Sequence, residues 1–103
     1  MRFENPEHVA PFHFYLDIND YTGISAASYE DLLISIKKVK AKSLSFHVGR
    51  GDFEKWVRDT FKDENLAKRI GKLRKQKLRG QALRNRFYRI VSERLEELKA
   101  KDH

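Results

Sequence analysis

The chain of 103 residues contains no cysteine. This absence excludes disulfides and thiolate chemistry, so a domain of this size must be held together by packing alone. The sequence also lacks any run that approaches the ~20 apolar residues of a membrane span, and its N-terminus lacks the apolar segment of a signal peptide. We therefore expect a cytoplasmic protein that does not contact membranes.

Acidic residues are missing from one long interval, which lies between Glu64 and Glu93. The formal net charge of the chain is +7, whereas residues 1–36 carry six acids and one base, a net charge of −5. A field of one sign this dense attracts nucleic acid, acidic protein or anionic lipid. We assign eight basic residues of the interval to a predicted polyanion-binding surface: Lys68, Lys72, Lys75, Lys77, Arg79, Arg84, Arg86 and Arg89.

A plainer interpretation of the same charges is a solvated surface that keeps the protein in solution. The abundance of Lys, Arg and Glu without cysteine is also typical of thermophile proteins. Both interpretations stay open on the sequence alone.

The N-terminal part of the chain predicts little helix. Residues 1–11 hold both prolines and are expected to be a loose lead-in. Residues 12–20 alternate between apolar and polar side chains, which indicates an extended segment with one apolar face. No partner strand is obvious, so we expect this segment to lie across helices. Residues 20–23 end in a glycine and predict a turn.

Residues 28–100 carry helical spacing and several helix-start signals. Ser28 precedes Tyr29-Glu30-Asp31 and predicts a helix cap. Asp52 and Asp63 are expected to cap two further helices, and a last helix is predicted from about Gln81 to Ala100. Residues 43–48 predict one or two helical turns ended by Gly49. The stretch from residue 74 to 80 is expected to be a frayed helix end and loop.

These segments together predict the fold class. It is mainly all-α, with a bundle of four to five helices and an extended N-terminal segment. Residues 1–103 are expected to form a single domain, since the sequence contains no linker, internal repeat or low-complexity segment.

Several short segments resemble a known family. They are Thr22-Gly23, Ser28-Tyr29-Glu30-Asp31-Leu32-Leu33, Ser43-Leu44-Ser45-Phe46-His47-Val48, Arg50-Gly51-Asp52-Phe53-Glu54-Lys55-Trp56-Val57 and Asp63-Glu64-Asn65-Leu66-Ala67. In this order they resemble the prokaryotic domain-of-unknown-function family 5752, over about residues 12–98. The resemblance implies a mostly helical domain without an established activity and offers no catalytic residues. The interval between Glu64 and Glu93 is more basic than the family pattern requires.

His47, Arg50 and Asp52 form the densest polar cluster beside apolar residues. A histidine near a carboxylate is suited to acid–base chemistry, because its pKa lies close to neutrality. No nucleophile or electrophile accompanies it, and helix capping accounts for Asp52. Arg50 and the backbone of a helix start are also suited to a phosphate, although the negative Asp52 opposes that use. We expect this cluster to be structural.

Other candidate sites are weaker. His13, Asp17 and Asp20 do not make a specific metal signature, and we predict neither a metal site nor a cofactor. Trp56, Phe53, Phe87 and Tyr29 sit at helical core spacing and are expected to be buried rather than to stack on bases. Tyr88, at the border of the last apolar stripe, is the aromatic we would assign to nucleic acid. Arg94 falls within that stripe, so it either snorkels or faces a partner.

The sequence supports three functional hypotheses, in this order. The first is a non-enzymatic binding module that engages nucleic acid phosphates through the basic surface. The second is a protein–protein adaptor or homodimer that uses the apolar N-terminal segment and the last helix. The third is an enzyme built around His47.

Overall fold

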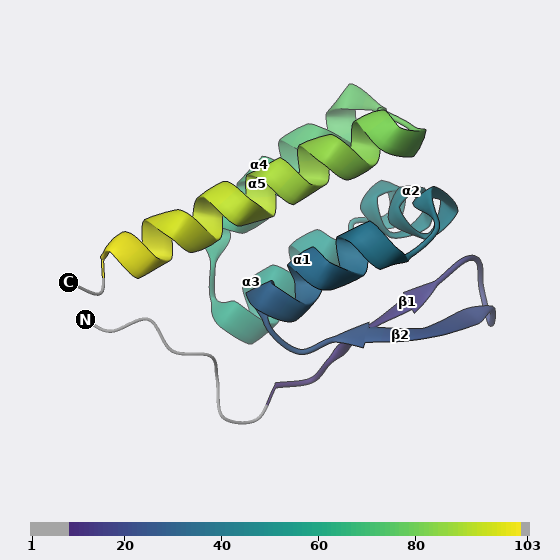
Figure 1. The fold of residues 1–103 in the computed structure, drawn as a ribbon, viewed down its shortest axis with the longest axis horizontal. Coiled ribbons are helices and arrows are strands. Elements are labelled where there is room, and N and C mark those ends of the chain that lie inside the picture. The colour runs from purple at the N-terminus through teal and green to yellow at the C-terminus, as the bar shows by residue number, and fades with distance from the viewer. Residues whose placement is uncertain (1–8, 102–103) are drawn as a thin grey trace.

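The structure is a computed structural model that describes residues 9–101. Two strands precede five helices: β1 (Phe12–Tyr15), β2 (Tyr21–Ala26), α1 (Tyr29–Lys38), α2 (Ala41–Arg50), α3 (Asp52–Phe61), α4 (Glu64–Gln76) and α5 (Gly80–Ala100). The sheet lies on one side of α1 and α3, and the α4–α5 pair lies on the other side (Figure 1). The predicted mainly helical class is confirmed, and the five helices agree with the four to five expected. The predicted lead-in falls largely on residues 1–8, outside the described residues.

The extended segment does have a partner strand, which corrects the prediction. β1 pairs antiparallel with β2, with Phe12 opposite Ala26 and Tyr15 opposite Tyr21. The turn joining them lies in residues 16–20, where the Leu16 N–H donates to the Asp20 carbonyl at 2.9 Å. The chain reverses four residues earlier than the glycine at position 23 suggested, so the predicted turn at 20–23 is wrong.

Gly23 has a different role within β2. Its φ is +83°, a conformation that favours glycine. The register is irregular here, because one residue separates His13 from Tyr15 on β1 while three separate Ser25 from Tyr21 on β2. The Thr22 hydroxyl donates to the Phe14 carbonyl at 2.7 Å across this bulge. The glycine therefore accommodates a β-bulge rather than a turn.

The helix starts at Ser28 and Asp63 are confirmed. The Ser28 hydroxyl accepts from the Asp31 N–H, and the Asp63 carboxylate accepts from the Leu66 N–H. The helix start at Asp52 is different: Gly51 is the N-cap, at a φ of +77°, and no side chain caps α3. Asp52 is thus the first residue of the helix, and its carboxylate is available for another role.

The remaining boundaries extend the predicted helices. α2 runs from Ala41 to Arg50, longer than the one or two turns expected, and passes through Gly49. α4 continues to Gln76, so the first three residues of the stretch expected to be a frayed end and loop are helical, and residues 77–79 form the loop. Lys77 then takes a left-handed conformation and ends α4.

A single cluster of buried side chains joins the sheet to all five helices. α1 packs between β2 and α5, α3 packs against α4, and α2 bridges β1 to α5. The predicted burial of Tyr29, Phe53, Trp56 and Phe87 is confirmed. Each such aromatic contributes a large apolar area, which stabilises a small domain that has no disulfide.

Candidate functional site

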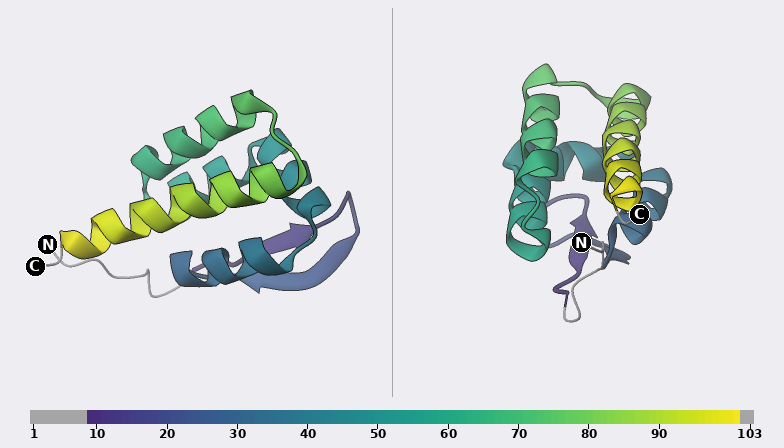
Figure 2. Two further views of the ribbon diagram at one scale, coloured as in Figure 1. Left: turned by 45° about the horizontal axis from the view of Figure 1, so that its top comes forward. Right: turned by 90° about the vertical axis from the view of Figure 1, so that its left-hand side faces the viewer.

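The α4–α5 hairpin brings the basic interval to one end of the molecule. The two helices run side by side and are joined by a short loop (Figure 2). We call this end the basic tip and define it by six exposed residues from both helices and the loop: Lys72, Lys75, Lys77, Arg79, Arg86 and Arg89. Lys68 is also exposed, further along α4.

An open groove of about 760 Å³ lies between the basic tip and α2. Its apolar lining consists of Val48, Leu73, Leu78 and Leu83, and Ser45 and Gly49 complete the α2 wall. All of its titratable lining residues are cations: Lys42, Arg74, Lys75, Lys77 and Arg79. We call it the inner groove. Since no carboxylate of residues 9–101 lines it, the charges add to a field of one sign.

A second groove, of about 430 Å³, lies between α4 and α5. Lys72 and Leu73 line it from α4, and Arg86 and Ile90 line it from α5. This outer groove differs from the inner one because Glu93 and Glu97 line its far end. Its field is therefore positive toward the loop and partly neutralised toward the C-terminus of α5.

Leu73 lines both grooves, and the two grooves lie on either side of it. Successive helix residues are about 100° apart, so Lys72 and Arg74 project to opposite sides of Leu73. Leu78, in the loop, likewise lines the inner groove and a smaller hollow that adjoins Arg86 and Arg89. The tip is thus a ridge with cations on both flanks.

Arg84, one of the eight predicted polyanion-binding residues, is engaged within the fold. Its guanidinium donates to the Val39 carbonyl at 2.8 Å and to the Lys37 carbonyl at 3.3 Å. These carbonyls belong to the end of α1, where helices leave acceptors without partners. Arg84 is only partly exposed, so it stabilises the α1–α5 contact and contributes less to the surface than predicted.

Three other arginines of the interval have carboxylate partners. Arg69 donates to Glu97 at 2.8 Å, and Arg74 donates to Glu54 at 3.1 Å. Arg89 lies 3.9 Å from Glu93, four residues later on α5, which is an exposed and weak pair. By contrast, within residues 9–101 no ion pair forms at Lys42, Lys72, Lys75, Lys77, Arg79 or Arg86.

Tyr88 lies away from the grooves. Arg86 precedes it by two residues, about 200° around the helix, so the two side chains project to nearly opposite faces of α5. The Lys37 ammonium sits 4.6 Å from the centre of the Tyr88 ring, which half-buries the ring against α1. The structure therefore gives Tyr88 a place in the α1–α5 contact instead of on the basic surface.

The His47 cluster is organised around a buried imidazole that is 4% exposed. His47 Nε2 accepts the backbone N–H of Tyr15 at 2.8 Å. Because that N–H can only donate, the ring proton sits on Nδ1, which donates to the Asp52 carboxylate at 2.8 Å. Arg50 lies 3.3 Å from the same carboxylate oxygen. Asp52 thus orients the histidine instead of capping the helix.

Burial lowers the pKa of His47, and its bond to Asp52 offsets this only in part. The neutral form is the one that can bond Tyr15 and Asp52 together. His47 consequently ties α2 to β1, and both of its ring nitrogens are used in that link. Neither nitrogen is directed at a substrate in this arrangement.

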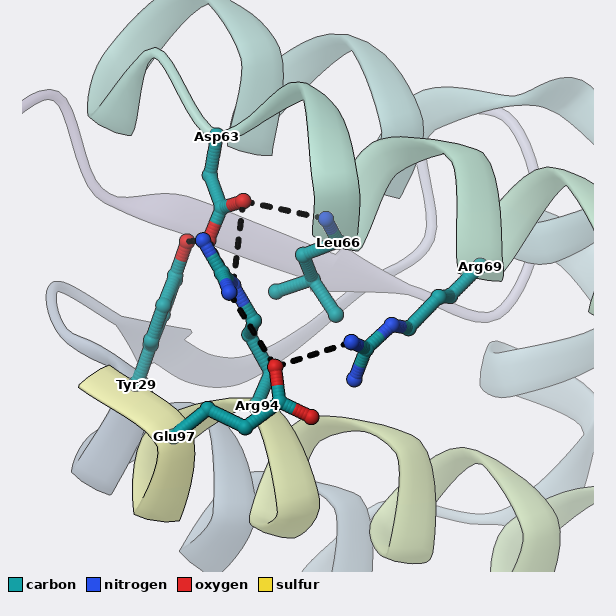
Figure 3. A network of polar contacts seen from close by, with 6 residues as sticks. All are labelled: Tyr29, Asp63, Leu66, Arg69, Arg94 and Glu97. Carbon is teal, nitrogen blue, oxygen red and sulfur yellow. Dashed lines mark hydrogen bonds and ion pairs between the residues drawn. The ribbon is translucent and has the colours of Figure 1, made fainter. Parts of the chain in front are cut away.

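Arg94 is neither snorkelling nor facing outward. It is 9% exposed, and its Nε donates to both Asp63 oxygens, at 3.2 and 3.0 Å. Tyr29 donates its hydroxyl to the same carboxylate at 2.8 Å, so the three side chains join α1, α4 and α5 (Figure 3). Glu97 then bridges Arg94 to Arg69, with bonds of 3.1 and 2.8 Å. Spacing alone gave Asp63 only its cap role.

The contacts among Tyr29, Asp63 and Arg94 determine the protonation states of Tyr29 and Asp63. Burial alone would raise the pKa of Asp63, but the bonds from Arg94, the Leu66 N–H and Tyr29 lower it overall. Burial also raises the pKa of Tyr29, and Asp63 raises it further, so the hydroxyl stays a donor. The charges of this cluster are neutralised within the fold, because Asp63 pairs with Arg94, and Glu97 pairs with Arg94 and Arg69.

His13, Asp17 and Asp20 do not converge on a metal. His13 Nδ1 bonds the Ser25 hydroxyl at 2.7 Å. In the described part of the chain, no group of three or more His, Cys, Asp or Glu side chains is placed to hold a metal ion. Among residues 9–101, no helix has the length and apolar character needed to cross a membrane.

No family model matches this chain, and neither a curated protein nor a solved structure is similar to it. The resemblance to domain family 5752 therefore stays a prediction.

Proposed function

We propose that this protein is a non-enzymatic binding module that engages nucleic acid through its basic tip. The observation that carries the proposal is the inner groove, whose five titratable lining residues are all cationic. Phosphate groups suit such a groove, because each neutralised phosphate releases a condensed counterion and so favours binding. Contacts to phosphates position a protein on nucleic acid without reading its sequence.

The state of the cations supports this assignment. A surface that serves only solvation intersperses charges of both signs. Here six exposed cations around the two grooves have no carboxylate partner in residues 9–101. Because internal carboxylates do not neutralise these charges, they can attract an external anion.

The test is fluorescence anisotropy with labelled nucleic acid of random sequence, over about 50 to 200 mM salt. A variant with Lys72→Gln, Lys75→Gln and Arg86→Gln should lower the log–log salt slope by about three, one unit for each lost phosphate contact. The matched control changes three exposed lysines at the other end of the molecule, Lys62, Lys99 and Lys101, to glutamine. An unbound wild-type protein at low salt, or an equal loss in the control, would refute the proposal.

The alternative of a protein adaptor has a weaker basis. The apolar face of the N-terminal segment is covered, since Phe12 and Phe14 belong to the core. The stripe of α5 is buried as well. The large apolar side chains exposed in the described residues are Ile18, Tyr21 and Ile34, which lie on separate elements. A stable dimer in sedimentation runs at two salt concentrations would favour the adaptor.

A further inference from the structure

We infer that the basic tip binds double-stranded nucleic acid and contacts the phosphates of both strands. This inference rests on the proposed function and names its ligand class. Two independent observations support it: the cations lie on both flanks of one ridge, and no aromatic side chain of residues 9–101 lines the grooves.

The first observation is the arrangement of charge around the ridge. Lys42 and Lys75 line the inner groove, whereas Lys72 and Arg86 line the outer groove. Leu73, which is buried, lines both grooves, and Leu78 lines the inner groove and the hollow beside Arg86. A duplex presents two phosphate backbones on either side of a groove, so a ridge with two cationic flanks can neutralise both strands at once. A single strand lying in one groove would leave the other flank unused.

The second observation concerns the bases. Proteins that hold single strands without sequence preference stack the bases on aromatic side chains, which contribute about 1–3 kcal/mol per base. No aromatic residue lines the inner groove, the outer groove or the hollow beside Leu78, as far as residues 9–101 are concerned. Tyr88 is held under Lys37 on the other face of α5. The tip therefore offers phosphate contacts without base stacking, which suits a duplex whose bases are already paired.

Charge density points in the same direction. Double-stranded DNA carries one charge per ~1.7 Å of axis, about twice the density of one strand, and its salt slope per contact is steeper. A protein that relies on cations alone gains more from the denser polyanion. The partial neutralisation of the outer groove by Glu93 and Glu97 confines these contacts to the loop end.

The experiment compares a short labelled duplex with one of its own strands, by anisotropy over the same salt series. Two variants separate the flanks: Lys42→Gln with Lys75→Gln for the inner groove, and Lys72→Gln with Arg86→Gln for the outer groove. All four side chains are exposed, so the fold should be kept, which circular dichroism would verify. The pair Lys99→Gln with Lys101→Gln is the control, because Lys99 lies ~28 Å along α5 from its first residue.

We expect the duplex to bind about tenfold or more tightly than the single strand at ~100 mM salt. Each flank variant should lower the duplex salt slope by about two, and the control should leave it unchanged. The inference is overturned if the single strand binds as tightly as the duplex, or if only one flank variant changes duplex binding. Salt-dependent binding of either form would still uphold the proposed function, whereas no binding of both would remove it.

Discussion

In the C-terminal half of α5, Arg94 is 9% exposed and bonded to Asp63 and Glu97, whereas near its N-terminus Arg86 is exposed and has no carboxylate partner in the described residues. The same residue type on one helix is therefore used in two ways. At the C-terminal end the acids of α4 and α5 lie within reach, and the charges hold helices together. At the basic tip the only acid paired within the described residues is Glu93, which lies 3.9 Å from Arg89, and the other five cations have no carboxylate partner there.

The number of basic residues between Glu64 and Glu93 therefore overstates how many cations are available to bind a ligand. Of the basic side chains between Glu64 and Glu93, Arg69, Arg74 and Arg84 are partly exposed and bonded within the domain. The lysines of α4 and the loop are exposed and have no carboxylate partner within residues 9–101. The charge of the basic tip comes in equal parts from three lysines and three arginines, and both residue types bind phosphate.

The largest effect should follow from breaking the internal pair at the C-terminal end. Arg94→Met leaves the Asp63 carboxylate buried without its counterion, and we expect a loss of about 3–5 kcal/mol in the free energy of unfolding. Urea unfolding measures this loss. Asp63→Ser combined with Arg94→Met keeps a capping oxygen for Leu66 and removes both charges, so it should lose less than the two single variants together. Additive losses would show that the two charges do not interact.

A smaller effect is expected where the His47 link is removed. Because the folded-state pKa of His47 lies below its ordinary 6.5, the unfolded chain binds the proton more readily. This contribution to stability is fully present above pH ~6.5 and is lost as the pH falls toward the lowered pKa. His47→Gln should cost about 1–3 kcal/mol at pH 7, since it disturbs the bond to the half-buried Tyr15 N–H. The variant should also weaken the decline in stability below pH ~6.5, measured by urea midpoints; a decline as steep as in wild type would exclude His47 as its source.

Replacing Arg84 or Arg86 by methionine sharpens the contrast within the basic interval itself. Arg84→Met removes the donors that satisfy the end of α1 and should cost about 1–2 kcal/mol. Arg86→Met changes an exposed, unpaired side chain and should stay within about 0.5 kcal/mol. Thermal unfolding of the two variants provides the comparison. Equal stability of both would mean that the Arg84 bonds to Lys37 and Val39 contribute nothing.

The smallest effect on stability is expected at Glu93, which lies between the basic tip and the C-terminal end of α5. Glu93→Gln removes an exposed partner of Arg89 and should change stability by less than about 0.5 kcal/mol. The outer groove then loses a negative charge, so nucleic acid affinity should rise about twofold, in line with the modest size of surface charge effects. Anisotropy at low salt measures the change. An unchanged or lower affinity would place the bound phosphates away from the outer groove.

Several features followed from the sequence because they depend on near neighbours. Ser28 and Asp63 cap helices through an N–H three residues later, and the periodic spacing of Tyr29, Phe53 and Phe87 places them in the core. The absence of acids between Glu64 and Glu93 fixes a local excess of positive charge whatever the fold. These features depend on residues close together in the sequence, so they can be predicted from the sequence.

The tertiary structure decided what depends on distant pairs. β2 was missed because its strand-forming residues flank a glycine that resembles a turn, and only pairing with β1 selects the bulge. Asp52 was expected to cap α3 but bonds His47. Arg94 was expected either to snorkel or to face a partner, but it bonds Asp63, 31 residues earlier. Lys42 joins the inner groove because α2 packs beside the tip. A side chain is buried and finds its partner only when segments remote in the sequence pack together. The tertiary structure therefore determines which charged residues are bonded within the fold and which are available to a ligand.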